Sequence, residues 1–265
     1  METPGLVVHG LAEPFSTALR SLVNNPQFSD VRFVVGQERQ EVFAHQCLLA
    51  CRCNFFQRLL GTEPGSSGVP RPVVLSTVPA EAFLAVLEFL YTNSVKLHRH
   101  SVLEVLTAAV EYGLEELREL CLEFVEKVLD VELACEALQV AVTFGLGPLQ
   151  ERCIAFIEAH SQEALRTRGF LELSAAALLP LLQSDKLCVD EAELVRAARS
   201  WARVGAVSGD RRSASAGRGN TVEQIVEAWR CHALRRVTPA QGAPYRRRSG
   251  TLPREHHRFL GLPFK

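Results

Sequence analysis

The chain has 265 residues and a formal net charge of −1, and 47% of its residues are hydrophobic and 22% charged. This length allows a sizeable core in one or two domains, and the composition is typical of soluble globular proteins. The longest apolar run, over residues 170–182, is interrupted by Glu172 and Pro180 and is too short to span a bilayer. The sequence therefore argues against an integral membrane protein.

The amino terminus lacks the basic start and apolar core of a secretory signal, so we expect a protein that is not secreted. Outside a secretory context, the eight cysteines predict reduced thiols in the cytoplasm or the nucleus. The charge is unevenly distributed: residues 205–265 hold 12 Lys and Arg against 4 Asp and Glu, a balance of +8, which leaves −9 for residues 1–204. The basic end either binds an anionic partner or is a solvated tail.

The first part of the chain predicts one helix followed by short strands. Apolar residues at helical spacing predict the helix, and Asn24-Asn25-Pro26 is expected to end it. Val31, Phe33 and Val35 alternate along the chain as in a strand, and a turn signal after them predicts a hairpin with a second strand. The predicted elements are, in order, a helix over 13–25, a strand over 31–35, a turn over 36–39, a strand over 40–44 and helical spacing over 46–60.

A loop rich in Gly, Ser and Pro follows over 61–72, and a third short strand is predicted over 73–75. Pro79 suits the first position of the next helix, because its missing N–H has no partner to lose there. Ser101 and Glu104 form a capping box that predicts the start of another helix, and Gly113 is expected to end it.

From residue 114 onward the pattern is almost wholly helical. A helix over 131–144 is expected to end at Gly145, and Gly147-Pro148 begins the next. Asp190 and Glu193 form a second capping box, ahead of a helix that carries Trp201. Three strands with helices, followed by a helical array, predict an α+β domain with an all-α extension.

Three blocks of the first half resemble the BTB/POZ family in their order and spacing. They are Phe28-Ser29-Asp30-Val31-Arg32-Phe33, Phe43-Ala44-His45 with Leu49-Ala50, and Phe83 to Thr92 with its Val86-Leu87-Glu88-Phe89-Leu90-Tyr91 run. The resemblance implies a small mixed sheet flanked by helices. It also implies a fold that works by pairing protein surfaces and not by catalysis.

The second half resembles the BACK region that follows BTB domains in kelch-type adaptors. The residues that carry this resemblance are Phe170-Leu171-Glu172-Leu173, Leu178 to Leu182, Ser184 to Val189, Glu193-Leu194-Val195, Ala198 and Trp201. The two resemblances together divide the chain into an N-terminal segment over 1–12, a BTB/POZ domain over 13–129, a BACK-like helical domain over 130–204 and a basic tail over 205–265.

The BACK-like pattern breaks after Trp201, where a low-complexity stretch over 208–217 replaces the helices usual in that family. Residues 225–232 then resemble the final BACK helix. We therefore expect the BACK region to be incomplete, with a piece missing between Ala206 and Thr221. No kelch-like repeats follow, so the substrate-binding propeller common in such adaptors is not expected.

The BTB resemblance implies homodimerisation through the first helix. The residues that it places at the dimer interface are Phe15, Leu19, Leu22 and Asp30. The alternative is that this apolar stripe folds back on its own core. Asp30 and His45 occupy positions where BTB domains have a buried polar pair, and for His45 a structural role is favoured over ligand binding. Gln46 stands where transcriptional BTB repressors commonly have Arg or Lys.

The resemblance also makes cullin-3 a candidate partner. The residues that it carries over to a cullin contact are Phe56, Leu59, Leu60, Glu63, Tyr91 and Asn93. The family's loop motif pairs a large apolar residue with a Glu two positions later. Here Gly61 precedes Glu63, so the apolar anchor is absent, and such a loss removes part of the buried centre of an interface, about 1–2 kcal/mol.

The sequence gives little support for a metal-binding site or a catalytic site. Cys51 and Cys53 lie too close in sequence for a typical zinc site, and we expect both to pack as small apolar groups. No arrangement of serine, histidine and carboxylate stands out. We expect no enzyme, no metal and no cofactor.

The sequence thus predicts a homodimeric BTB–BACK adaptor that recruits an unidentified substrate protein to a cullin-3 ubiquitin ligase. One alternative is a dimeric scaffold that never binds cullin. Another is a nuclear BTB cofactor that uses the basic tail on nucleic acid, which is disfavoured because no DNA-binding module is present.

Overall fold

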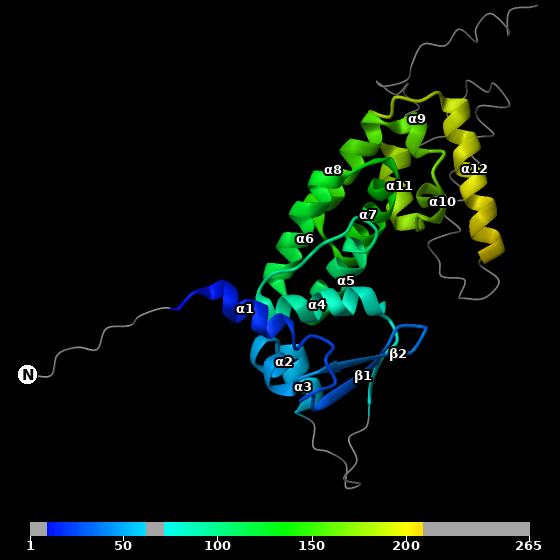
Figure 1. Cartoon of the computed structure of the whole chain (residues 1–265). Helices are drawn as coiled ribbons and strands as arrows, with labels where there is room; N and C mark the ends of the chain where they lie inside the picture. Colours follow the sequence, from blue (N-terminus) through cyan, green and yellow to red (C-terminus); the bar gives the residue numbers. More distant parts are fainter. Residues whose placement is uncertain (1–9, 62–71, 209–265) are drawn as a thin grey trace, which may run out of the picture. The chain divides into compact units, whose positions relative to one another are not determined.

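The computed structural model describes residues 10–61 and 72–208 (Figure 1). For Glu191 and residues 205–208 it describes the backbone but not the side chains. The chain divides into two compact units, residues 1–128 and residues 129–265. Among the residues that the structure describes, no helix is long and apolar enough to cross a membrane.

The first unit contains a three-stranded mixed sheet in the order β2-β1-β3. Strands β1 (Val31–Val35) and β2 (Gln40–Ala44) are antiparallel, with Phe33 opposite Val42, and β3 (Val73–Leu75) runs parallel to β1. Gly36, at φ 72°, takes the left-handed conformation that the turn between β1 and β2 requires. The predicted strands are therefore confirmed.

Besides this sheet, the described part of the unit contains six helices. Their bounds are α1 (Ala12–Arg20), α2 (Gln46–Arg52), α3 (Asn54–Leu60), α4 (Ala80–Thr92), α5 (Val102–Tyr112) and α6 (Glu115–Val128). An aromatic cluster forms the core between them: the ring of Phe33 lies 6.0 Å from that of Phe56 and 5.1 Å from that of Phe83, and the ring of Tyr112 lies 5.2 Å from that of Phe56.

The first helix is shorter than predicted, because α1 ends at Arg20 and not at residue 25. The Ser21 hydroxyl donates to the carbonyl of Ala18 at 2.7 Å, and Asn24 adopts a left-handed conformation with φ 51°. The Asn24 side chain then accepts a hydrogen bond from the N–H of Phe43 at 3.1 Å. The apolar spacing continues past residue 20, but the helix ends there because Ser21 and Asn24 form these hydrogen bonds instead of helical ones.

Two further predictions need correction. The helical spacing over 46–60 belongs to two helices, since Cys53 is extended (φ −145°, ψ 118°) and separates α2 from α3. Ser101 does precede α5, but its side chain makes no capping hydrogen bond, so the predicted capping box of Ser101 and Glu104 is wrong. Gly113 ends α5 with φ 69°, as predicted.

The second unit is helical throughout its described part. Its helices are α7 (Val131–Phe144), α8 (Gly147–Ala159), α9 (Ser161–Ala164), α10 (Arg168–Glu172), α11 (Ala175–Gln183) and α12 (Glu191–Ser208). Helix α7 lies at the centre and packs against α8, α9, α10 and α11. Polar side chains cap several helices: Asp130 accepts from Leu133 N–H at 2.9 Å, and Asp190 accepts from Ala192 N–H at 2.7 Å.

Helix α12 packs on α10, and Trp201 anchors it. The indole N–H of Trp201 donates to the carbonyl of Leu173 at 2.6 Å, and the ring is buried. This bond satisfies the polar atom that burial of an indole would otherwise leave unpaired. Most of the stretch where a piece of the BACK region was expected to be missing lies outside the described residues.

Candidate interaction surfaces

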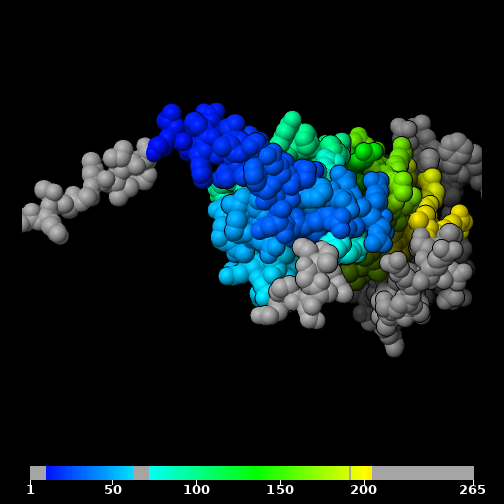
Figure 2. All heavy atoms as spheres, turned by 60° about the horizontal axis from the view of Figure 1, so that its bottom comes forward, coloured from blue at the N-terminus to red at the C-terminus, as the bar shows by residue number. Residues whose placement is uncertain are grey.

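Helix α1 makes polar contacts with α4 and leaves Phe15 exposed. Arg20 forms an ion pair with Glu88 at 3.0 Å, and the Ser16 hydroxyl reaches the carbonyl of Thr92 at 3.5 Å. None of the helix's residues is buried, and the Phe15 side chain is 68% exposed. Leu19 is half-buried. In Figure 2 the helix, drawn in dark blue, lies at the surface of its unit.

Two further exposed apolar residues of the first unit were missed by sequence reasoning. Leu11, just before α1, is 83% exposed, and Phe28, just before β1, is 78% exposed. Phe28 also has φ 64°, which is a strained conformation for an aromatic residue. Helical spacing could not reveal either residue, because both lie outside the helix.

His45 is paired with a tyrosine and not with the expected aspartate. It is buried, its backbone N–H donates to the Tyr91 hydroxyl at 2.9 Å, and its Nδ1 lies 2.9 Å from the same oxygen. Burial raises the pKa of Tyr91 to about 12, so the hydroxyl stays protonated and can both donate and accept. His45 Nε2 is buried without a partner among the described residues.

Asp30 is exposed and caps the start of α2. Its carboxylate accepts from the N–H of Gln46 at 2.7 Å, and the Gln46 amide donates to the carbonyl of Asp30 at 2.9 Å. The expected buried pair of Asp30 and His45 is therefore corrected: within one chain, Asp30 orients the backbone at the entrance to α2 while His45 is held by α4.

The candidate cullin residues fall into four groups, of which exposed Asn93 is the last. Phe56 and Tyr91 are buried, so neither side chain is available to a partner, and the expectation of direct contact is wrong for both. Leu59 and Leu60, at the end of α3, are half-buried. Glu63 lies outside the described residues.

Asn93 is exposed but its side chain is already engaged. It caps the end of α4 in a left-handed conformation with φ 55°. Its amide oxygen accepts a hydrogen bond from Arg52 of α2, and its amide nitrogen donates to Glu116 of α6 at 3.1 Å. Asn93 therefore ties three helices together, a role that sequence spacing did not reveal.

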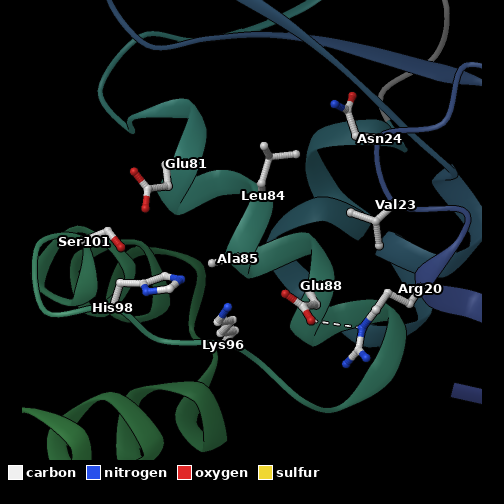
Figure 3. Close-up of a pocket in the computed structure, with 10 residues that line it drawn as sticks. All are labelled: Arg20, Val23, Asn24, Glu81, Leu84, Ala85, Glu88, Lys96, His98 and Ser101. Atoms are coloured by element: carbon white, nitrogen blue, oxygen red, sulfur yellow. Dashed lines mark ion pairs between the residues drawn. The ribbon is translucent and has the colours of Figure 1, made fainter. Parts of the chain in front are cut away.

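A groove runs along the solvent-facing side of α4 (Figure 3), with a volume of about 420 Å³. It is lined by Arg20, Val23, Asn24, Glu81, Leu84, Ala85, Glu88, Lys96, His98 and Ser101. The residues of α4 lie between the N-terminal residues on one side and Lys96, His98 and Ser101 on the other. His100 binds Glu81 at 2.8 Å and lowers the pKa of that carboxylate through this hydrogen bond.

The cysteines form no metal-binding cluster in the described part of the chain, where no three His, Cys, Asp or Glu side chains converge. Cys53 is buried, and its thiol donates to the carbonyl of Tyr112 at 3.4 Å. Cys51 is exposed, so the expectation that both residues pack as apolar groups holds only for Cys53.

The small mixed sheet with its helices and the helical second unit match two known families. The BTB/POZ domain family matches residues 19–129, and the family described as BTB And C-terminal Kelch, or BACK, matches residues 134–214. The chain therefore belongs to the BTB/POZ family and carries a BACK region.

Relatives extend this assignment to the full length. The chain is 76% identical to BTB/POZ domain-containing protein 19 of Homo sapiens and to that of Bos taurus, in each case over 292 positions that cover all of both chains. It is 31% identical to BTB/POZ domain-containing protein 9 of Homo sapiens over 199 residues, covering 74% of this chain and 32% of that one. The structure of the BTB domain of human Gigaxonin is 19% identical and covers 46% of this chain and 99% of its own, with a TM-score of 0.38.

The alignment with the human protein is longer than this chain. It spans 292 positions, whereas the chain has 265 residues, so 27 positions of the alignment have no residue from this chain.

Proposed function

We propose that this protein is a non-catalytic adaptor that homodimerises through its BTB domain and recruits a partner protein to a cullin-3 ubiquitin ligase. The observation that carries the proposal is the uncovered apolar side of α1 in a chain of the BTB/POZ family. A helix that buries none of its residues gains little from its own unit, whereas a second copy could cover Phe15 and remove its apolar surface from water.

The cullin part of the proposal depends on the end of α3. Leu59 and Leu60 remain half-buried there, and they are the apolar residues of the candidate set that a partner could reach. Phe56 contributes indirectly: its ring packs against Phe83 and Tyr112 and fixes the position of α3. A rigid helix that presents two leucines is the kind of preorganised contact on which protein interfaces depend.

A dimeric scaffold without cullin binding is the second candidate, and Gly61 is the observation that favours it. A side chain at this position would place its Cβ 2.8 Å from the carbonyl oxygen of Gln57. The backbone after α3 is therefore shaped for glycine, and the apolar anchor of the family's loop motif does not fit there without a shift of the chain.

Calorimetric titration of the full chain with the N-terminal domain of cullin-3 tests the adaptor function. We expect submicromolar binding that Leu59→Glu weakens roughly tenfold or more, since loss of a central apolar contact costs at least about 1.4 kcal/mol. Val204→Glu is the matched control, because Val204 is 39% exposed in the second unit. Absence of binding by a folded wild-type dimer would leave the scaffold as the function.

A further inference from the structure

Two exposed thiols lie on the same side of α2. Cys47 and Cys51 are four positions apart within this helix, and both are exposed. Residues at this spacing are neighbours on a helix surface, with Cβ atoms about 5–6 Å apart. The Cys51 thiol donates to the carbonyl of Leu48 at 3.3 Å, so its sulfur lies over the preceding turn, which carries Cys47. Helix α2 therefore presents two neighbouring thiols to solvent.

The other described cysteines of the first unit are buried. Cys53 and Cys121 are both in the core, and burial raises the pKa of Cys121 to about 12. A thiol with such a pKa keeps its proton at neutral pH and is a poor metal ligand, because the thiolate is the form that binds. In the described part of this unit, the pair on α2 is thus the one set of accessible thiols.

The spacing of the pair selects the kind of ligand. A disulfide requires Cβ atoms about 3.5–4.5 Å apart, which is closer than the helix sets them, so a disulfide would distort α2. A linear arrangement of two thiolate–metal bonds of about 2.3 Å each sets the sulfurs roughly 4.5 Å apart. Because each sulfur can lean inward from its Cβ, this distance fits the undistorted helix.

The number of ligands selects the metal. Thiolates favour Cu(I), zinc and iron–sulfur clusters. Structural zinc and iron–sulfur clusters each require about four protein ligands, and no third His, Cys, Asp or Glu side chain converges with the pair among the described residues. Cu(I) is the ion of this group that two thiolates alone can hold in a linear geometry.

We propose that Cys47 and Cys51 bind one Cu(I) ion between their two sulfurs. Each thiol loses one proton, two copper–sulfur bonds form, and no electron is transferred, so the bound group carries one negative charge. Loss of the Cys51 proton also breaks the hydrogen bond to Leu48. The site requires neither a second copy nor cullin-3, so it goes beyond the proposed function.

Competition for Cu(I) tests the site in the full chain. Reduced, oxygen-free protein is titrated with Cu(I) in the presence of bathocuproine disulfonate, whose colour reports the copper that the protein does not hold. We expect one ion per chain. Cys47→Ser and Cys51→Ser should each weaken binding at least about a hundredfold, because a single thiolate cannot chelate the ion. Cys188→Ser, which removes an exposed thiol of the second unit, is the matched control and should leave the affinity unchanged.

Two further readouts distinguish this site from unspecific binding by thiols. Calorimetry in two buffers of different ionisation enthalpy should show two protons released per ion, because both thiols must be deprotonated. X-ray absorption of the loaded protein should show copper with two sulfur neighbours. Three or more sulfur neighbours, or equal retention of copper by Cys51→Ser and the wild type, would overturn the proposal.

The oligomeric state of the protein gives the remaining outcomes. One ion per two chains would place the copper between copies and overturn a site within one helix. Copper retained by Phe15→Glu but not by the wild type would show that a second copy covers α2, and it would overturn the site in the protein as it exists. Sedimentation reports dimerisation without copper, so failure of the copper site and failure of the dimer can be distinguished.

Discussion

Helices α1 and α3 both carry apolar residues at helical spacing, and the sequence assigned partner contacts to both. In α3, Phe56 is fully buried within an aromatic cluster of its own unit, whereas α1 buries none of its residues and leaves Phe15 68% exposed. The same local pattern therefore has two outcomes. Periodicity shows that a helix has an apolar face, but only the packing around it decides whether that face belongs to the core or to a partner.

The largest expected effect is the difference in stability between substitution of Phe56 and substitution of Phe15. Phe56→Ala should lower the free energy of unfolding of the first unit by about 3–5 kcal/mol, because it leaves a cavity among Phe33, Phe83 and Tyr112. Phe15→Ala should change the stability of the monomer by less than about 0.5 kcal/mol, as is usual for exposed positions. Urea denaturation at low protein concentration measures both. Equal effects would contradict the assignment of Phe56 to the core and Phe15 to the surface.

The core should also be sensitive to alkaline pH. Burial raises the pKa of Tyr91 and of Tyr112 to about 12, above the unfolded value near 10. Below pH 10 both states hold these protons, so the stabilisation is fully present. Between pH 10 and 12 only the unfolded state loses them, and the free energy of unfolding should fall by about 1.4 kcal/mol per pH unit for each tyrosine.

Urea denaturation of the wild type and of Tyr91→Phe at pH 8 and pH 11 measures this effect. The variant should lose stability at pH 8 by about 1–3 kcal/mol, because His45 loses its hydroxyl partner, and it should show a shallower alkaline decline. An identical pH slope in the two proteins would show that Tyr91 does not contribute.

The Asn93 bridge should have an intermediate effect. Asn93→Ala removes both side-chain hydrogen bonds and keeps a Cβ in the left-handed region without the polar side chain that offsets its strain, at a cost of about 1–2 kcal/mol. Asn93→Gly removes the same hydrogen bonds but tolerates φ 55°, so it should cost less. Thermal denaturation of the two variants separates these contributions. If glycine costs as much as alanine, the bridge to Arg52 and Glu116 accounts for the whole effect.

The smallest effect is expected for the attachment of α1 to its own unit. The ion pair of Arg20 with Glu88 joins side chains that are 51% and 24% exposed, so water and salt screen it. Arg20→Ala should lower the free energy of unfolding by less than about 1 kcal/mol, and 1 M salt should remove most of the difference. A loss of several kcal/mol in denaturation experiments would show that α1 is an integral part of the core.

Much of the fold could be predicted from the sequence. The strand over 31–35 has clear alternation, a turn signal separates it from the strand over 40–44, and the strand over 73–75 is a short apolar run. The helix over 131–144 has a cap at Asp130 and a stop at Gly145. The end of α1 and the break at Cys53 could not be predicted, because both depend on hydrogen bonds or backbone turns that leave no mark on apolar spacing.

The sites were predicted less completely. The resemblance identified His45 as a structural polar residue but not its partner Tyr91, which lies 46 positions away in the sequence. Asn93 was placed near a contact surface, whereas its bonds to Arg52 and Glu116 arise from three helices that meet only in the folded chain. Burial of Phe56 and Tyr91 likewise depends on tertiary packing, which single-sequence patterns do not contain.

Sedimentation equilibrium of the full chain and of Phe15→Glu tests most directly whether the uncovered side of α1 belongs to a second copy. The wild type should sediment with twice the mass of one chain and the variant with the mass of one chain, while Val204→Glu remains dimeric. Both proteins should keep the same circular dichroism spectrum, which shows that the fold is retained. A wild type that is monomeric at all concentrations, or a Phe15→Glu variant that stays dimeric, would contradict the role of α1 as the dimer surface.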